Sequence, residues 1–119
     1  MRFISPYPPG GGNDTLARIL ADKVGDGLGQ RMIVDNRPGA NTIVGSEIIA
    51  KAAPDGHTFI LLPTSFVTNP AFYRKLPYDT ERDFAPVALI ALSPQMLVSH
   101  LSIPAGSVKE LVVLFRARA

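Results

Sequence analysis

The residues best suited to chemistry lie in one short stretch rich in proline and glycine, from Tyr7 to Asp14. Its glycines carry no Cβ, so the backbone can approach a ligand closely and adopt angles that other residues avoid. Asn13 and Asp14 are of the types that cap helices. A bare loop before a helix N-terminus binds anions, because unpaired N–H groups and the positive end of the helix dipole face the same way. We therefore expect one half of a site for a small anion, formed by Tyr7, Gly11, Gly12, Asn13 and Asp14.

The same stretch also fits a tight strand-to-helix turn that binds nothing, and its own sequence leaves that alternative open. Two nucleotide motifs are excluded. A P-loop needs a lysine after the last glycine, and none follows here. The dinucleotide fingerprint needs a third glycine where Thr15 stands. What remains suits a small carboxylate better than a nucleotide.

A second polar stretch, Pro63 to Asn69, follows the apolar run Thr58 to Leu62. Its hydroxyl and amide groups could bind a carboxylate through neutral hydrogen bonds, and ordinary turn and capping chemistry would explain the same residues. We expect the second half of the site to contain Thr64, Ser65 and Asn69.

Little in the sequence indicates catalysis. The chain has no cysteine, and His57 and His100 each lie where a structural role is expected. No nucleophile-elbow motif surrounds Ser65, and no spacing of histidines and carboxylates predicts a metal site. We therefore expect neither an enzyme nor a metal or cofactor. Two alternatives remain: a small α/β enzyme that uses the loop Gly10–Gly12 for a phosphate ester, or a non-functional truncated fragment that binds no ligand.

Composition narrows the class of protein. The chain has 119 residues, 46% of them hydrophobic, and a formal net charge of only +2 from scattered basic residues. This is typical of a small globular domain and gives no reason to expect nucleic-acid binding. No apolar run approaches the roughly 20 residues that span a bilayer. No signal peptide is expected either, because Pro6 to Asp14 interrupts the N-terminus at once.

The order of elements predicts an α/β fold. Strands are expected at 1–5, 32–34 and 58–62, and helices at 14–28 and 42–53. This alternation is typical of a parallel sheet with right-handed crossovers, flanked by helices. The two polar stretches would then leave carboxyl ends of strands, where open α/β sheets bind ligands.

Apolar spacing predicts the buried side of each helix. The first helix should end at Gly29, and its inner face should carry Leu16, Ile19, Leu20, Val24 and Leu28. The second helix should bury Ile43, Val44, Ile48 and Ile49.

The second half of the chain is less regular. A short helical turn is expected from Thr68 to Tyr73, then a polar loop over 75–84. Two further strands are expected at 87–92 and 96–99, separated by Ser93, Pro94 and Gln95. A capping box at Ser107–Glu110 should open a last helix that runs to Ala119.

Six segments in order resemble the Bug-type extracytoplasmic solute receptors, the substrate-binding proteins of tripartite tricarboxylate transporters. They are Pro6–Arg18, Asp35–Ala40, Ala50–Gly56, Asn69–Tyr73, Lys75–Asp79 and Asp83–Val87. The resemblance implies a type II periplasmic-binding-protein fold, of which this chain holds the first lobe (1–100) and the crossover and first helix of the second (101–119). It also implies a small carboxylate ligand, membrane subunits of the transporter as partners, a periplasmic location and no catalysis.

The resemblance places all eight candidate site residues in two ligand-lining loops. Asp14 is expected to hold the glycine loop, because its carboxylate would repel an anion.

Overall fold

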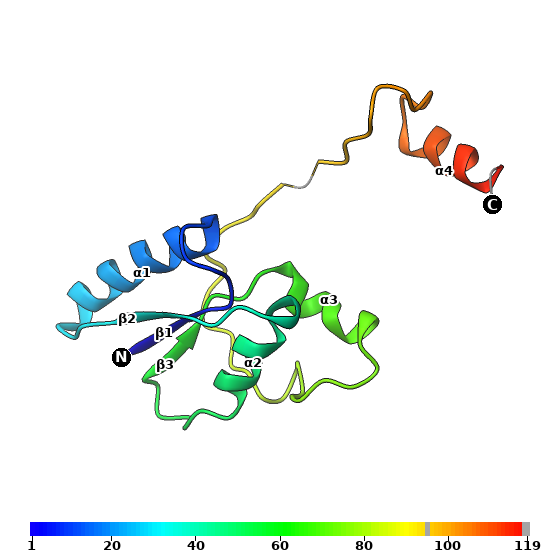
Figure 1. The fold of residues 1–119 in the computed structure, drawn as a ribbon. Helices are drawn as coiled ribbons and strands as arrows, with labels where there is room; N and C mark the ends of the chain where they lie inside the picture. The colour runs from blue at the N-terminus through cyan, green and yellow to red at the C-terminus, as the bar shows by residue number, and fades with distance from the viewer. Residues whose placement is uncertain (95, 118–119) are drawn as a thin grey trace. The chain divides into compact units, whose positions relative to one another are not determined.

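A sheet of three short parallel strands lies at the centre of the N-terminal part of the chain (Figure 1). The strands are β1 (Arg2–Ser5), β2 (Ile33–Asn36) and β3 (Thr58–Ile60), in the order β2-β1-β3. Phe3 in β1 pairs with Val34 on one side and Phe59 on the other. The predicted α/β class and parallel sheet are therefore confirmed. The boundaries differ, since β2 continues through Asp35 and Asn36, beyond the predicted strand at 32–34.

The computed structural model describes residues 1–94 and 96–117. They fall into two units, Met1–Pro86 and the residues from Val87 onward, and each is described here by itself. None of the helices that the structure describes is both long and apolar enough to cross a bilayer.

Two helices cover opposite faces of the sheet (Figure 1). Helix α1 (Gly12–Leu28) packs on β1 and β2, and α2 (Ile43–Ala50) packs on β1 and β3. A single 3₁₀ turn, η1 (Ala40–Thr42), leads into α2. Gly29 ends α1 with a φ of 63°, the left-handed conformation that glycine adopts most readily, as predicted. The second helix is shorter than expected, because it begins at Ile43 and ends at Ala50.

The buried face of α1 is not the predicted one. Its buried residues are small or polar: Asp14, Ala17, Ala21 and Gly25. Ala17 and Ala21 form the core with Phe3 and Met32, and they let the helix lie close to the sheet. Of the five predicted apolar residues, Leu20 packs beside this core, whereas Ile19, Val24 and Leu28 are exposed. The hydrophobic period was right, but close helix–sheet packing selected the neighbouring stripe of small side chains.

The same correction applies in part to α2. Its fully buried residues are Gly45 and Ser46, while Ile43, Ile48 and Ile49 are half-buried and Val44 is exposed. A Cβ on Gly45 would lie 2.9 Å from Cβ of Pro6. This helix therefore reaches the end of β1 only because residue 45 has no side chain.

The third helix, α3 (Thr64–Phe72), begins four residues before the predicted short turn. A small aromatic cluster attaches the following loop to it. Phe66 of α3, Tyr78 and Phe84 have ring centroids between 4.7 and 5.9 Å apart. Tyr78 is buried, so this cluster acts as a second, smaller core.

The residues from Val87 onward contain one described element, α4 (Val108–Arg116). The hydroxyl of Ser107 accepts a hydrogen bond from the N–H of Glu110, and the Glu110 carboxylate accepts from the N–H of Gly106, which confirms the predicted helix start. The strands predicted at 87–92 and 96–99 are wrong, since these residues form no ladder. A strand needs a neighbouring strand for its N–H and C=O groups, and the described residues of this unit provide none. Gln95, Arg118 and Ala119 lie outside the described residues, and with them part of the predicted linker and the end of the last helix.

Candidate functional site

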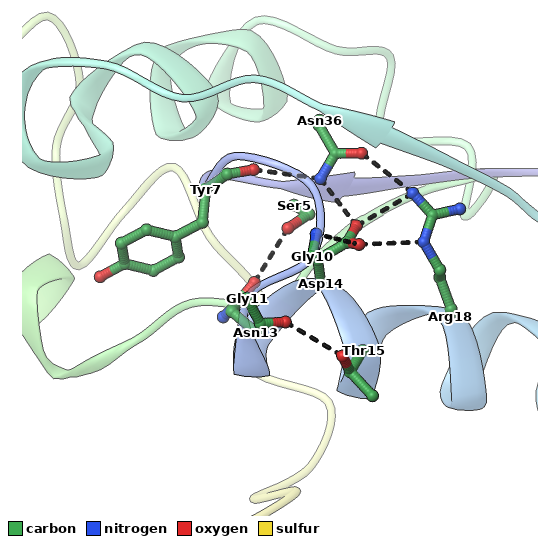
Figure 2. Close-up of polar contacts among 9 residues, drawn as sticks. All are labelled: Ser5, Tyr7, Gly10, Gly11, Asn13, Asp14, Thr15, Arg18 and Asn36. Atoms are coloured by element: carbon green, nitrogen blue, oxygen red, sulfur yellow. Dashed lines mark hydrogen bonds and ion pairs between the residues drawn. The ribbon is translucent and has the colours of Figure 1, made fainter.

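A buried carboxylate organises the loop between β1 and α1 (Figure 2). Asp14 Oδ2 accepts hydrogen bonds from the N–H of Gly10 at 2.9 Å and from Nε of Arg18 at 3.0 Å. Its Oδ1 accepts from Nδ2 of Asn36 at 2.8 Å and from the Arg18 guanidinium at 3.1 Å. Asn36 also donates to the carbonyl of Tyr7. Asp14 thus holds the glycine loop against the end of β2, as predicted.

The charge of Asp14 is strongly stabilised in the folded chain. The hydrogen bond from Arg18, then those from Gly10 and Asn36, lower the pKa of Asp14 from 3.8 to about 2, although its burial opposes this. Every partner favours the ionised form. The side chain is therefore a fixed anion that belongs to the framework of the loop.

Asn13 links two strand ends. Ser5 Oγ, at the end of β1, donates to Asn13 Oδ1 at 3.0 Å, and Asn13 Nδ2 donates to the carbonyl of Leu61, just after β3, at 3.4 Å. Adjacent strands β1 and β3 lead to different helices at this point, which is where open α/β sheets form ligand crevices. The predicted helix cap is wrong, however, because the N-cap is Gly11 and no side chain caps the helix.

The N-terminus of α1 presents free donors. Among the described residues, none accepts a hydrogen bond from the N–H groups of Gly12, Asn13 or Asp14. Gly11 and Gly12 are exposed, and a Cβ on Gly12 would meet no atom within 4 Å. The turn before them depends on Gly10, whose φ is 89°. This arrangement has the geometry expected of an anion site at a helix N-terminus.

The remaining predicted side chains differ in what they offer. The ring of Tyr7 points away from the Asp14 network (Figure 2). Thr64 is exposed at the start of α3. Ser65 Oγ is buried and has no hydrogen-bond partner within the described part of the chain. The Tyr7 ring, the Thr64 side chain and Ser65 Oγ thus take no part in the hydrogen bonds of Asp14 and Asn13 described above.

Both polar groups of the Asn69 side chain form hydrogen bonds inside the fold. Asn69 is completely buried in α3, its Oδ1 accepts from Asn41 Nδ2 at 2.7 Å, and its Nδ2 donates to the carbonyl of Asn41 at 2.9 Å. Its predicted place in a loop is corrected, because α3 begins at Thr64 and contains it. Contact of any of the eight predicted residues with a ligand stays a prediction.

Three residues of this framework were not predicted: Ser5, Arg18 and Asn36. The guanidinium of Arg18 donates to Asp14 Oδ2 and to Asn36 Oδ1. The spacing of Asp14 and Arg18, four residues apart on one helix, was a usable signal. Asn36 gave none, since its partners lie 18, 22 and 29 residues away.

A second ionic group lies on β2. Asp35 pairs with Arg2 of β1 and with Arg37. Partial burial would raise the pKa of Asp35, but hydrogen bonds from the two arginines hold it below its usual value. The described residues contain no group of three or more potential metal ligands.

Comparison with known families gives one consistent result. Residues 16–119 match the family model "Tripartite tricarboxylate transporter family receptor", a family of receptors and not of enzymes. A curated relative, encoded in the tcbD–tcbE intergenic region of Pseudomonas sp. (strain P51), is 44% identical over 105 residues. That alignment covers 88% of this chain and 30% of the relative. The chain spans about a third of the length of the curated relatives it matches.

Solved structures agree. Rpa4515 of R. palustris with adipate is 36% identical, with a TM-score of 0.77. MatC from Rhodopseudomonas palustris with bound malate is 30% identical, with a TM-score of 0.78. Each alignment covers 98% of this chain and 40% of the solved one. The periplasmic binding protein BugD is 33% identical, with a TM-score of 0.68 over 71% of this chain and 28% of its own. The sheet and helices described above thus match part of a periplasmic-binding-protein structure.

Proposed function

The chain belongs to the tripartite tricarboxylate transporter receptor family, and from this premise we propose that it forms part of a receptor that captures a small dicarboxylate for uptake. Two relatives support this ligand class, because their solved structures hold adipate and malate. The partners would be the membrane subunits of the transporter. The location would be the periplasm, as for BugD.

The observation that carries this proposal is the N-terminus of α1. Three successive N–H groups, of Gly12, Asn13 and Asp14, have no partner among the described residues, beside exposed glycines. One carboxylate of the ligand would accept from these donors, and Thr64 and Ser65 at the start of α3 would add hydroxyl donors. Asp14 would not repel the ligand, because its charge is neutralised by Arg18 within the framework.

The division of the receptor follows the family fold. Residues 1–100 would belong to the first lobe, and 101–119 would begin the second. A single lobe supplies only part of the ligand's hydrogen bonds and cannot close over it. We therefore expect this 119-residue chain to bind adipate or malate at best in the millimolar range, about 4 kcal/mol.

The test compares two glycines of α1. Gly12 and Gly27 are both exposed, and a Cβ on either would meet no atom within 4 Å. Amide chemical shifts of the ¹⁵N-labelled chain are followed while adipate or malate is added. Gly12→Val should abolish the ligand-dependent shifts, because its side chain blocks the donors, whereas Gly27→Val should leave them. Equal binding by Gly12→Val would refute the proposed site.

The alternative function uses the same loop for a phosphate ester. A titration with glycerol phosphate, followed by an assay for released phosphate, separates the two. Binding of dicarboxylates without turnover of the ester supports the receptor. Ester hydrolysis that is lost in Gly12→Val would favour the enzyme.

A further inference from the structure

The loop between β2 and α2 has an unusual backbone. Ala40, Asn41 and Thr42 have φ values of 46°, 51° and 76°, so three consecutive residues that are not glycine adopt the left-handed region. Such angles are costly for residues with a Cβ and most unusual for a β-branched one such as threonine. Thr42 is also 1% exposed, and its hydroxyl has no hydrogen-bond partner among the described residues. Thr42 therefore carries two unfavourable features that the surroundings must compensate.

The compensation comes from α3. Asn69 makes a reciprocal pair of hydrogen bonds with Asn41, one to its side chain and one to its backbone carbonyl, at 2.7 and 2.9 Å. Asn69 is completely buried, and within the described part of the chain its side chain makes no other hydrogen bond. Its two polar groups thus fix the middle residue of the strained turn. Strain of this kind persists only where the surrounding structure over-determines it.

The position of the turn connects it to the candidate site. It follows the carboxyl end of β2, the edge at which the loops after β1 and β3 also lie. The N–H groups of Ala40 and Asn41 have no partner among the described residues. Successive N–H groups in a turn of this type form a concave surface that attracts anions.

We propose that Asn69 is a positioning residue that holds the Gly39–Thr42 loop in its left-handed turn, and that this loop is a third ligand-facing segment of the site. The second part rests on the proposed function. Asn69 would then influence the ligand through Asn41 without touching it.

The first experiment is a double-mutant cycle on thermal stability of the chain. Asn69→Ala should lower the melting temperature by about 5 °C or more. In a Thr42→Gly background the loss should fall to less than half, because glycine adopts the turn without help. Thr42→Ala is the matched control, since it removes the same hydroxyl but keeps a Cβ, and the full loss should remain. Equal losses in all three backgrounds would mean that Asn69 is an ordinary core contact and would overturn the positioning role.

If Asn69→Ala does not fold, Asn69→Ser serves in the same cycle. It keeps a neutral polar group at this buried position, introduces no charge and loses the paired amide hydrogen bonds to Asn41. The loss and its rescue by Thr42→Gly should be of the same sign. A loss that Thr42→Gly leaves unchanged would again contradict the proposal.

The second experiment measures which backbone amides respond to the ligand. Adipate at tens of millimolar should shift the amides of Asn41 and Thr42 together with those of Gly12 and Asn13. In Asn69→Ala the shifts at 41 and 42 should vanish while those at 12 and 13 remain. Wild-type shifts at 12 and 13 alone would overturn the third loop and leave the proposed function intact. No shift anywhere would refute the proposed function and the third loop, and the stability cycle would still decide whether Asn69 holds the turn.

Discussion

Residues 1–86 and the residues from Val87 onward have similar apolar side chains but bury them very differently. In β1, Phe3 is 8% exposed and Ile4 is fully buried. Between Val87 and Leu101, side chains of the same kind, such as Leu92 and Met96, are more than 80% exposed. The difference lies in the neighbours, because β1 has a strand on each side and a helix on each face, whereas 87–94 and 96–99 have no ladder.

This comparison shows that an apolar sequence does not by itself ensure burial. Apolar side chains are buried only where the topology places other strands or helices against them. The stripe Ile19, Val24 and Leu28 on α1 makes the same point inside the first unit, because it is apolar at helical spacing and exposed. Exposed apolar surface of this extent is typical of a face that another segment or molecule covers.

The largest expected contrast is between matched truncations in the two regions. Ile4→Ala should lower the free energy of unfolding by about 3 kcal/mol, because it leaves a cavity under the central strand. Leu92→Ala should change it by less than about 0.5 kcal/mol, because its side chain already faces water. Urea unfolding followed by circular dichroism measures both. Comparable losses would mean that the second region is packed in solution.

A slightly smaller effect is expected where α2 touches the end of β1. Gly45→Ala should cost about 2 kcal/mol, since the new Cβ would lie 2.9 Å from Pro6 Cβ and 3.2 Å from the Arg37 carbonyl oxygen. Gly27→Ala in α1 has no such neighbour and should be neutral or stabilise by up to about 1 kcal/mol. Melting curves of the two variants should therefore move in opposite directions. A neutral Gly45→Ala would contradict the close packing of α2.

The Asp14 network should give the N-terminal unit a dependence on pH. The pKa of Asp14 is lowered to about 2 in the folded chain, below its ordinary value of 3.8, so its contribution is complete above about pH 4 and is lost as the pH falls toward 2. Asp14→Asn should lower the melting temperature at pH 7 by about 5 °C. The difference from the wild type should shrink between pH 4 and pH 2. A difference that stays constant over that range would assign the effect to shape rather than charge.

The smallest effect on stability is expected from a charge in the exposed apolar segment. Leu92→Lys should change the free energy of unfolding by less than about 0.5 kcal/mol. It should nevertheless reduce self-association of the chain, because a charge interrupts an apolar run that can pair with another copy. Light scattering over a range of concentrations tests this. Unchanged association would point to another surface, such as the exposed stripe of α1.

Features with a local cause were predictable from sequence. Gly29 ends α1 and Ser107 opens α4 because each acts on its own helix terminus. The three strands were found because their apolar runs are short and bounded by turn residues. The predicted strands at 87–92 and 96–99 failed because a strand also depends on a partner that its own residues do not specify.

The candidate site also combines features that depend on local sequence with features that depend on distant residues. The glycine loop and its position before a helix could be read from residue types alone. Which polar side chains are free could not, because that depends on partners far along the chain. The sequence did not show that Asn41, 28 residues earlier, forms hydrogen bonds with both polar groups of Asn69.

The strand order has a consequence for the timing of synthesis. β1 is central, yet both of its partners follow it in the chain, and the N–H of Leu61 donates to the carbonyl of Ile4. At translation rates of about 5 to 20 residues per second, β1 waits roughly 3 to 11 s for β3 to be made. During that interval Phe3 and Ile4, which are buried in the folded chain, lack the strand that completes the sheet around them. The topology therefore delays folding until about half of these residues have been synthesised.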